Sequence, residues 1–206
     1  MAENNSSRIN LDGLFRQNIV LMSGLLTAPI IVAATTAERA LVLTLSFLMI
    51  AYTSILVCRF IPRKIVYAVR ILLYAVVAAA FYIPTALLLT HIFPDTASGI
   101  SIYLEIIVVN SLLMAKTESR FYLQPYGIMA VDALIYVVGY AMVAFLVGIV
   151  REILAYGTLF GFHLCDELMP AAKSPFFGFV MVGILAAVCR AIAHNRKPSR
   201  KGGAPL

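Results

Sequence analysis

Residues 132–161 read DALIYVVGYAMVAFLVGIVREILAYGTLFG, and this stretch decides the fold class of the chain. The apolar run that follows Asp132 contains no charged residue until Arg151 and Glu152. About 20 helical residues are enough to cross the hydrocarbon core of a bilayer. The stretch therefore predicts a membrane-spanning helix with a carboxylate at one end and two opposite charges at the other.

The composition of the whole chain agrees with a membrane protein. The 206 residues are 62% hydrophobic and 13% charged, and the mean hydropathy is +0.93. These values exclude an ordinary soluble globular domain. Backbone that faces lipid must form its hydrogen bonds within its own segment, so we expect an all-α membrane protein.

Six apolar segments divide the chain, and we expect each of them to be a transmembrane helix. They lie near 19–35, 40–58, 65–90, 100–115, 127–150 and 175–193. The expected organisation is a polar N-terminal tail (1–17), a six-helix membrane domain (18–193) and a basic cytoplasmic tail (194–206). Nothing near the first segment is typical of a cleavable signal peptide, so we expect that segment to remain in the membrane.

The distribution of Lys and Arg predicts the orientation. With the N-terminus inside, thirteen of the 16 basic residues fall on the cytoplasmic side, and Arg39, Arg151 and Lys173 fall outside. Cytoplasmic loops carry an excess of Lys and Arg, so both termini are expected to be cytoplasmic. The same positions account for the net charge of +6 without any nucleic-acid partner.

The first and fourth segments are short or interrupted. Pro29 lies in the first, where it lacks the amide that a helix needs, and Asn110 lies in the fourth. Interrupted helices at matching places in two three-helix halves indicate two inverted repeats, with a site between them at the middle of the membrane. The alternative is that both residues are ordinary packing features of a helical bundle.

Known catalytic patterns are absent from the sequence. There is no Walker loop, GxGxxG, HExxH or GxSxG motif. The three cysteines, Cys58, Cys165 and Cys189, form no metal-binding pattern, and the spacing of His163 and Cys165 with the acids beside them fits no standard metal site. A self-contained enzyme is not expected.

Three acidic residues in or near the predicted helices are candidates for an ion path. Glu105 lies within the fourth segment, where it is either a cation or proton site or a carboxylate that faces the outer water. Asp132 either pairs with Lys116 or Arg120 or accepts a cation from the cytoplasm. The same two alternatives hold for Glu118.

Arg151 and Glu152 are adjacent, so on a helix their side chains point about 100° apart and do not pair with each other. Each needs a partner elsewhere, for which Glu38 and Arg39 are candidates. A structural role is favoured over a catalytic one for both residues.

The fifth segment also carries the clearest family resemblance. Asp132, Arg151-Glu152-Ile153-Leu154 and Gly157-Thr158-Leu159-Phe160-Gly161 resemble the fifth helix of the membrane subunits of the Nqr and Rnf redox-driven pumps. The resemblance is strongest to the NqrD and RnfE branch of these membrane subunits. Asn18, Pro29, Thr35 and Val108-Val109-Asn110 match the short helices of that family, and the similarity covers roughly residues 18–162.

The resemblance implies a six-helix inverted repeat, a partner subunit of the same fold and opposite topology, and flavin and iron–sulfur cofactors in the complex. In the family one cysteine in each half helps to hold a [2Fe–2S] cluster. Here those positions align with Ala28 and Ser111, and neither side chain is a suitable soft ligand. We therefore expect no cofactor to be bound by this chain alone.

The function predicted from these features is that of a subunit of an Rnf/Nqr-type ion-translocating electron transport complex in the bacterial plasma membrane. The expected partners are other subunits of that complex and the lipid bilayer. Two alternatives stay open, a stand-alone transporter on the same scaffold and a structural assembly subunit. The coupling ion and the redox partners are not predicted by the sequence.

Overall fold

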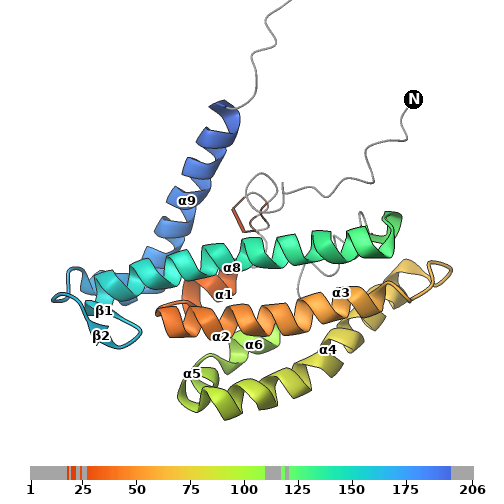
Figure 1. Ribbon diagram of the computed structural model, residues 1–206, viewed down its shortest axis with the longest axis horizontal. Coiled ribbons are helices and arrows are strands. Elements are labelled where there is room, and N and C mark those ends of the chain that lie inside the picture. The colour runs from red at the N-terminus through yellow and green to blue at the C-terminus, as the bar shows by residue number, and fades with distance from the viewer. Residues whose placement is uncertain are drawn as a thin grey trace, which may run out of the picture.

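The computed structural model is helical with one small hairpin (Figure 1). It describes Asn18, Val20, Leu21, Gly24, residues 27–109, Thr117, Glu118 and residues 121–195. The elements are α1 (Thr27–Ala33), α2 (Ala37–Phe47), the π-helix η2 (Leu48–Tyr52), α3 (Thr53–Cys58), α4 (Tyr67–Ile92), α5 (Pro94–Gly99), α6 (Ser101–Ile106), η3 (Phe121–Leu123), α8 (Tyr126–Tyr156), β1 (Thr158–Leu159), β2 (Phe162–His163), η4 (Pro170–Lys173) and α9 (Pro175–Asn195).

Four helices in the described part of the chain are long and apolar enough to cross a membrane. They are Ala37–Cys58, which joins α2, η2 and α3, then α4, α8 and the Pro175–Ile192 part of α9. They correspond to the predicted segments 40–58, 65–90, 127–150 and 175–193. The arrangement of six helices in two inverted repeats remains a prediction.

The fifth segment is longer than the sequence suggested. Its helix, α8, has 31 residues and ends at Tyr156, beyond the predicted end at residue 150. The prediction ended the helix at the first charges because charges usually mark the water boundary. Arg151 and Glu152 are instead buried, so the helix continues past them.

Two short helices occupy the places of the first and fourth segments. α1 has 7 residues and is separated from α2 by residues 34–36. α6 has 6 residues, and residues 110–115 of the fourth segment lie outside the described residues. Both described pieces are too short to cross a bilayer alone.

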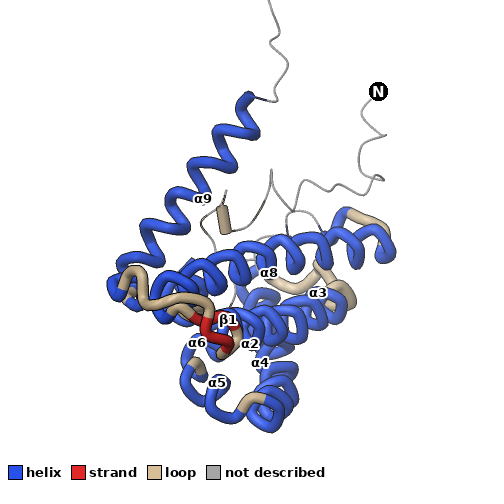
Figure 2. The backbone as a smooth tube through the Cα atoms, turned by 60° about the vertical axis from the view of Figure 1, so that its left-hand side comes forward, coloured by secondary structure: helices blue, strands red, loops and turns tan. Residues whose placement is uncertain are grey.

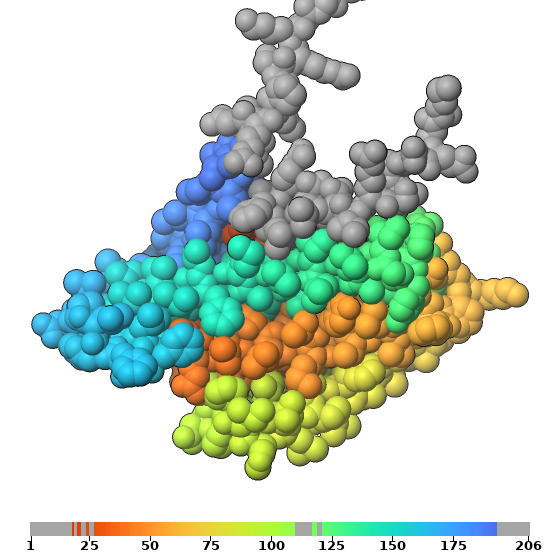
Figure 3. Space-filling model, in the orientation of Figure 1, coloured from red at the N-terminus to blue at the C-terminus, as the bar shows by residue number. Residues whose placement is uncertain are grey.

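The long helices pack as a layer in which α2 and α3 lie between α8 and α4 (Figure 3). α2–α3 and α8 run side by side in opposite directions, whereas α9 diverges from the others (Figures 1 and 2). We call the end that contains the start of α2, α5 and the β1–β2 hairpin the hairpin end. The other end, with residues 58–67, Thr117, Glu118 and residues 121–126, is called the basic end.

The core lies between α2–α3 and α8. The rings of Phe47 and Tyr140 stack with their centroids 4.1 Å apart, and both side chains are fully buried. Just after Phe47 the helix widens into the π-turn η2, and the Thr53 hydroxyl donates hydrogen bonds to the carbonyls of Met49 and Ile50. α4 and α9 are mostly exposed, as expected for helices whose outer faces contact lipid.

The hairpin end is shaped by Gly157, which ends α8. Gly157 has a φ of 65° and adopts the left-handed conformation that is common after the last turn of a helix. A Cβ atom at this position would lie 1.8 Å from the carbonyl oxygen of Cys165. Glycine therefore allows the chain to turn back at once, which holds the β1–β2 hairpin beside the start of α2.

Gly148 sets how closely α8 approaches α2. A Cβ atom there would lie 2.7 Å from the Cβ atom of Ala40 and 2.9 Å from the carbonyl oxygen of Thr36. Small residues allow membrane helices to approach each other closely. The contact is made with helix backbone and with a side chain that cannot rotate away, so a larger residue would push the helices apart.

We predict that Gly148→Ala lowers the thermal unfolding temperature of the purified chain, because overpacking a close contact costs roughly 1–3 kcal/mol. Gly127→Ala is the matched control on the same helix, since a Cβ atom there has nothing within 4 Å. Equal unfolding temperatures for the two variants would contradict the close contact.

Candidate functional site

The site that the sequence singled out, Arg151 and Glu152, lies at the hairpin end of α8. Arg151 is fully buried, and within the described part of the chain each hydrogen bond that it donates goes to a backbone carbonyl. Nη1 donates to Ile31 at 2.6 Å and to Ala34 at 3.3 Å. Both carbonyls belong to the end of α1 and the break that follows it.

The other nitrogens of Arg151 hold the start of α9. Nε donates to the carbonyl of Ala172 at 3.1 Å, and Nη2 donates to the carbonyls of Lys173 and Ser174 at 3.3 and 3.2 Å. One guanidinium thus joins three parts of the chain, namely α8, the end of α1 and the entry to α9. A Cβ atom at Gly178 would lie 2.6 Å from the carbonyl oxygen of Ile31, so glycine is also needed for this approach.

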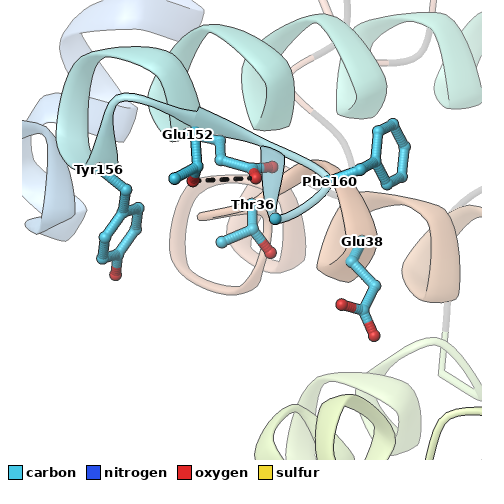
Figure 4. A pocket seen from close by; sticks show the side chains of 7 residues that line it. Thr36, Glu38, Glu152, Tyr156 and Phe160 are labelled. Carbon is cyan, nitrogen blue, oxygen red and sulfur yellow. Dashed lines mark hydrogen bonds between the residues drawn. The ribbon is translucent and has the colours of Figure 1, made fainter. Parts of the chain in front are cut away.

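Glu152 holds the other side of the same break. Its Oε2 accepts a hydrogen bond of 2.7 Å from the backbone amide of Ala37, the first residue of α2. Its Oε1 accepts a hydrogen bond of 3.3 Å from the Thr158 hydroxyl in β1 (Figure 4). Glu152 is 4% exposed, and its hydrogen bond with the amide of Ala37 is buried, whereas the one from Thr158 is only partly buried.

The charges of this pair match the polarity of the helix ends that they contact. The last carbonyls of a helix carry partial negative charge, and its first amides carry partial positive charge. Arg151 lies against the end of α1, and Glu152 lies against the beginning of α2. Consecutive residues of α8 therefore satisfy the two opposite helix ends at the break.

The partners of Arg151 and Glu152 differ from those suggested by the sequence. Glu38 accepts a hydrogen bond from the Thr96 hydroxyl at 2.6 Å, and Arg39 donates to the Thr35 hydroxyl at 2.9 Å. The sequence-based suggestion was wrong because it considered opposite charges alone. The partners are backbone groups next to α1, α2 and α9, together with the Thr158 hydroxyl for Glu152.

A cavity of about 360 Å³ opens beside the break at the hairpin end. Its lining consists of Thr36, Glu38, Glu152, Tyr156, Thr158, Phe160 and Gly161. The Thr158 hydroxyl donates to Glu152 in its wall, and Figure 4 shows that the carboxylate of Glu38 points away from Glu152. The carboxylate of Glu152 is already engaged by the backbone of α2, so this cavity is part of the structural junction.

Glu118 lies at the basic end and forms an ion pair with Arg70. Nε and Nη2 of Arg70 donate to its two oxygens at 2.5 and 2.7 Å, and the Tyr74 hydroxyl donates to Oε1 at 2.6 Å. The fork of two parallel hydrogen bonds is the strong geometry for Arg and a carboxylate. Of the alternatives for Glu118, the structure shows an ion pair, with a partner 48 residues away that the sequence did not indicate.

The surroundings of Glu118 also determine its protonation. Burial alone raises the pKa of this carboxyl, but the hydrogen bonds from Arg70 and Tyr74 lower it more, so the net pKa lies below its ordinary value of 4.5.

Arg63 and Arg59 lie over the ring of Tyr122, at 4.7 and 5.1 Å from its centre. These contacts join the loop after α3 to the segment before α8.

Asp132 is buried near the basic end of α8 and is 1% exposed. Its Oδ2 accepts a hydrogen bond of 2.7 Å from Nε2 of Gln124. The suggested partners Lys116 and Arg120 lie outside the described residues. Gln124 is a partner that the sequence analysis missed, because an amide in a loop carries no signal of its own.

Asn18 connects the start of the described chain to α8. Its Nδ2 donates to the carbonyl of Gly139 at 2.9 Å, and its Oδ1 accepts from the amides of Val20 and Leu21. The sequence placed Asn18 in a family motif without assigning it a contact. Its buried amide ties the first segment to the middle of α8.

The resemblance predicted that Ala28 and Ser111 take the places of two family cysteines. Ala28 lies on α1 and is exposed. Ser111 lies outside the described residues. Glu105 is exposed on α6, on a different segment from Asp132 and Glu118.

The chain matches the family model described as "Rnf-Nqr subunit, membrane protein" over residues 7–186. It belongs to this family. The match spans most of the chain and includes the helix break, α8 and the hairpin.

Several relatives are named as subunits of ion-translocating complexes. The E-type subunit of the ion-translocating oxidoreductase complex of Sodalis glossinidius is 30% identical, over 82% of this chain and 72% of its own length. The corresponding protein from Pseudoalteromonas atlantica is 27% identical, over 76% and 68%. The D-type subunit of the Na⁺-translocating NADH-quinone reductase of Yersinia pestis is 26% identical, over 86% and 89%. Both kinds of relative are those that the resemblance predicted.

We predict that Arg151→Met strongly destabilises the chain, because it leaves several buried carbonyls without donors at roughly 1–3 kcal/mol each. Arg151→Lys keeps the charge but loses the planar fork, so it should recover only part of the stability. The measurement is the thermal unfolding temperature in lipid nanodiscs. If the lysine variant were as stable as the unmodified chain, the fork-shaped contacts would not be the reason for the arginine.

We predict a pH-dependent contribution from Glu118. A carboxyl whose pKa is lower in the folded state stabilises the fold above its unfolded pKa, and this stability is lost as the pH falls through the folded value. The unmodified chain should therefore lose stability below about pH 4.5, and Glu118→Gln should lack this component. The control is Glu167→Gln, because Glu167 and Lys173 form an exposed pair that contributes little. Identical pH profiles for the unmodified chain and Glu118→Gln would contradict the prediction.

Proposed function

We propose that this chain is a membrane subunit of an Rnf/Nqr-type ion-translocating electron transport complex in the bacterial plasma membrane, with both termini in the cytoplasm. The observation that carries the proposal is the family match over residues 7–186. Relatives that cover most of the chain are named as subunits of such complexes. The basic end would then face the cytoplasm, in agreement with the excess of Lys and Arg there.

In this proposal the chain supplies helices to the core of the complex and does not hold the mid-membrane [2Fe–2S] cluster. Ala28 offers no ligand atom, and serine at position 111 is a poor substitute for a thiolate. Cys58 lies at the basic end of α3, Cys165 lies between β2 and η4, and Cys189 lies on α9. Flavin and iron–sulfur groups would be carried by partner subunits, including one of the same fold and opposite topology.

The contacts divide the charged residues by role. Glu118 is held by Arg70, and Arg151 and Glu152 are held by backbone, so these residues support the fold. Asp132 and Glu105 are the remaining candidates for an ion path. Asp132 would receive cations from the cytoplasmic side, since it is buried close to the basic end.

A stand-alone transporter is the second candidate, and the alanine at position 28 is the observation that favours it. A chain that has no role in electron transfer would have no use for a cluster ligand. The same scaffold of broken helices could then serve ion or solute movement by itself. A purely structural assembly subunit is the third alternative.

We predict that the tagged chain, purified from its native membrane in mild detergent, brings with it flavin-containing and iron–sulfur subunits detectable by mass spectrometry and absorbance. Arg151→Met is a matched control for specificity, because it should lose the partners together with the fold. Isolation of the unmodified chain alone, or with copies of itself, would refute the complex and leave the transporter as the hypothesis to test.

A further inference from the structure

The loop between the first two long spans carries three basic residues, Arg59, Arg63 and Lys64. One span ends at Cys58 and the next begins at Tyr67. Residues 59–66 therefore lie at the surface of the membrane, where hydrocarbon gives way to lipid headgroups. The α8 span begins at Tyr126 at the same end of the bundle (Figure 1), so the basic end faces the headgroups of one leaflet.

One aromatic ring holds two of these three side chains. The guanidinium carbons of Arg63 and Arg59 lie 4.7 and 5.1 Å from the centre of the Tyr122 ring, so the two cations are no farther apart than the sum of these distances. The Tyr122 hydroxyl donates to the carbonyl of Cys58 at 3.3 Å, which fixes the ring against the end of α3. Contact with the ring stabilises each cation but leaves its positive charge in place. The loop thus holds two like charges close to each other.

The basic end has far more positive than negative charge. Between residues 59 and 70 and between 116 and 126 the sequence has one acid, Glu118, and six basic residues, namely Arg59, Arg63, Lys64, Arg70, Lys116 and Arg120. The Glu118 carboxylate accepts hydrogen bonds from Arg70 and Tyr74, and Arg63 donates to the backbone carbonyl of Glu118 at 3.1 Å. The ion pairs within the described part of the chain do not include Arg59, Arg63 or Lys64. These three cations are therefore available to an anion from outside the chain.

The Nε atom of Arg59 also lacks an acceptor. This atom is shielded from solvent and forms no hydrogen bond with any residue that the structure describes. A buried donor without an acceptor lowers the stability of the fold. An anion that binds the guanidinium group would supply acceptor oxygens to it.

Exposed apolar side chains accompany the cations at this end. The ring centres of Phe60 and Tyr126 lie 5.9 Å apart, and both side chains are exposed, as are those of Val66, Tyr67 and Leu123. Aromatic rings at the ends of membrane helices are typical of the headgroup level of a bilayer. A free phosphate ion offers nothing to these side chains, whereas a phospholipid has an anionic group and hydrocarbon in one molecule. The combination of positive charge and apolar surface therefore fits a lipid.

We propose that Arg59, Arg63 and Lys64 bind the phosphate group of an anionic phospholipid in the leaflet at the basic end. The guanidinium groups donate to the phosphate oxygens, for which their planar fork is suited, and the lysine adds charge. Phe60 and Tyr126 lie against the glycerol and the upper acyl chains. Basic pockets between membrane helices bind anionic lipid headgroups in this way. Binding needs only the chain and the lipid, so it is independent of the proposed complex.

The experiment is native mass spectrometry of the full chain in detergent, titrated with phosphatidylglycerol or with phosphatidylcholine. We expect tighter binding of phosphatidylglycerol. Each cation near an anionic headgroup contributes about a fivefold factor, so Arg59→Gln combined with Arg63→Gln should weaken phosphatidylglycerol binding roughly thirtyfold. Lys173→Gln is the matched control at the hairpin end, because Nζ of Lys173 also lies over a tyrosine ring, 4.7 Å from the centre of Tyr156. This control should bind phosphatidylglycerol as the unmodified chain does.

Lys64→Gln decides the result if the double arginine variant does not fold. Lys64 is exposed, so its replacement should leave the fold intact and weaken phosphatidylglycerol binding about fivefold. Equal affinity of the unmodified chain for the two lipids, or unchanged binding in the variants, would overturn the proposal and leave an acidic segment of another subunit as the partner of these cations. Displacement of the lipid by glycerol phosphate at a comparable concentration would also overturn it, because the cations would then recognise a soluble phosphate.

Discussion

The structure depends on one pair of adjacent charges that binds the end of α1 and the beginning of α2, two helices separated by residues 34–36. Helix breaks are costly inside a membrane because the released backbone groups have no water to bind. Arg151 supplies donors to the carbonyls that end α1, and Glu152 accepts from the amide that begins α2. Without these two side chains, the carbonyls at the end of α1 and the first amide of α2 would lose these hydrogen bonds inside the bundle. The close contacts at Gly148 and Gly178 serve the same junction.

Composition and periodicity were sufficient to predict the long helices, because each span must be apolar along its length. The four described spans lie within a few residues of their predicted positions, except at the end of α8. That end was missed because charged residues were taken to mark water. Their actual partners are backbone atoms that lie more than 100 residues away for Ile31, Ala34 and Ala37, and no local pattern reveals such contacts.

The candidate site shows the same limit of sequence-based prediction, because the sequence indicates which residues need partners but does not reveal distant partners. The sequence identified Arg151, Glu152, Asp132 and Glu118 as residues in need of partners, and burial confirms that Arg151, Glu152 and Asp132 lie inside the protein. It did not indicate Arg70 for Glu118, Gln124 for Asp132 or Gly139 for Asn18. Pairings between distant segments follow from how helices pack, which a single sequence does not specify.

The uninterrupted length of α8 restricts how this helix can move. Its 31 residues connect Asp132, near one end of the bundle, to Arg151 and Glu152 at the other. Sliding this helix by one residue would move every attached group by about 1.5 Å, which is more than the whole spread of normal hydrogen-bond lengths. α8 therefore cannot slide along its own axis without breaking the hydrogen bonds at both of its ends. A displacement of α1 or of the entry to α9 relative to α8 would likewise break the hydrogen bonds that Arg151 donates to the carbonyls of Ile31 and Ser174.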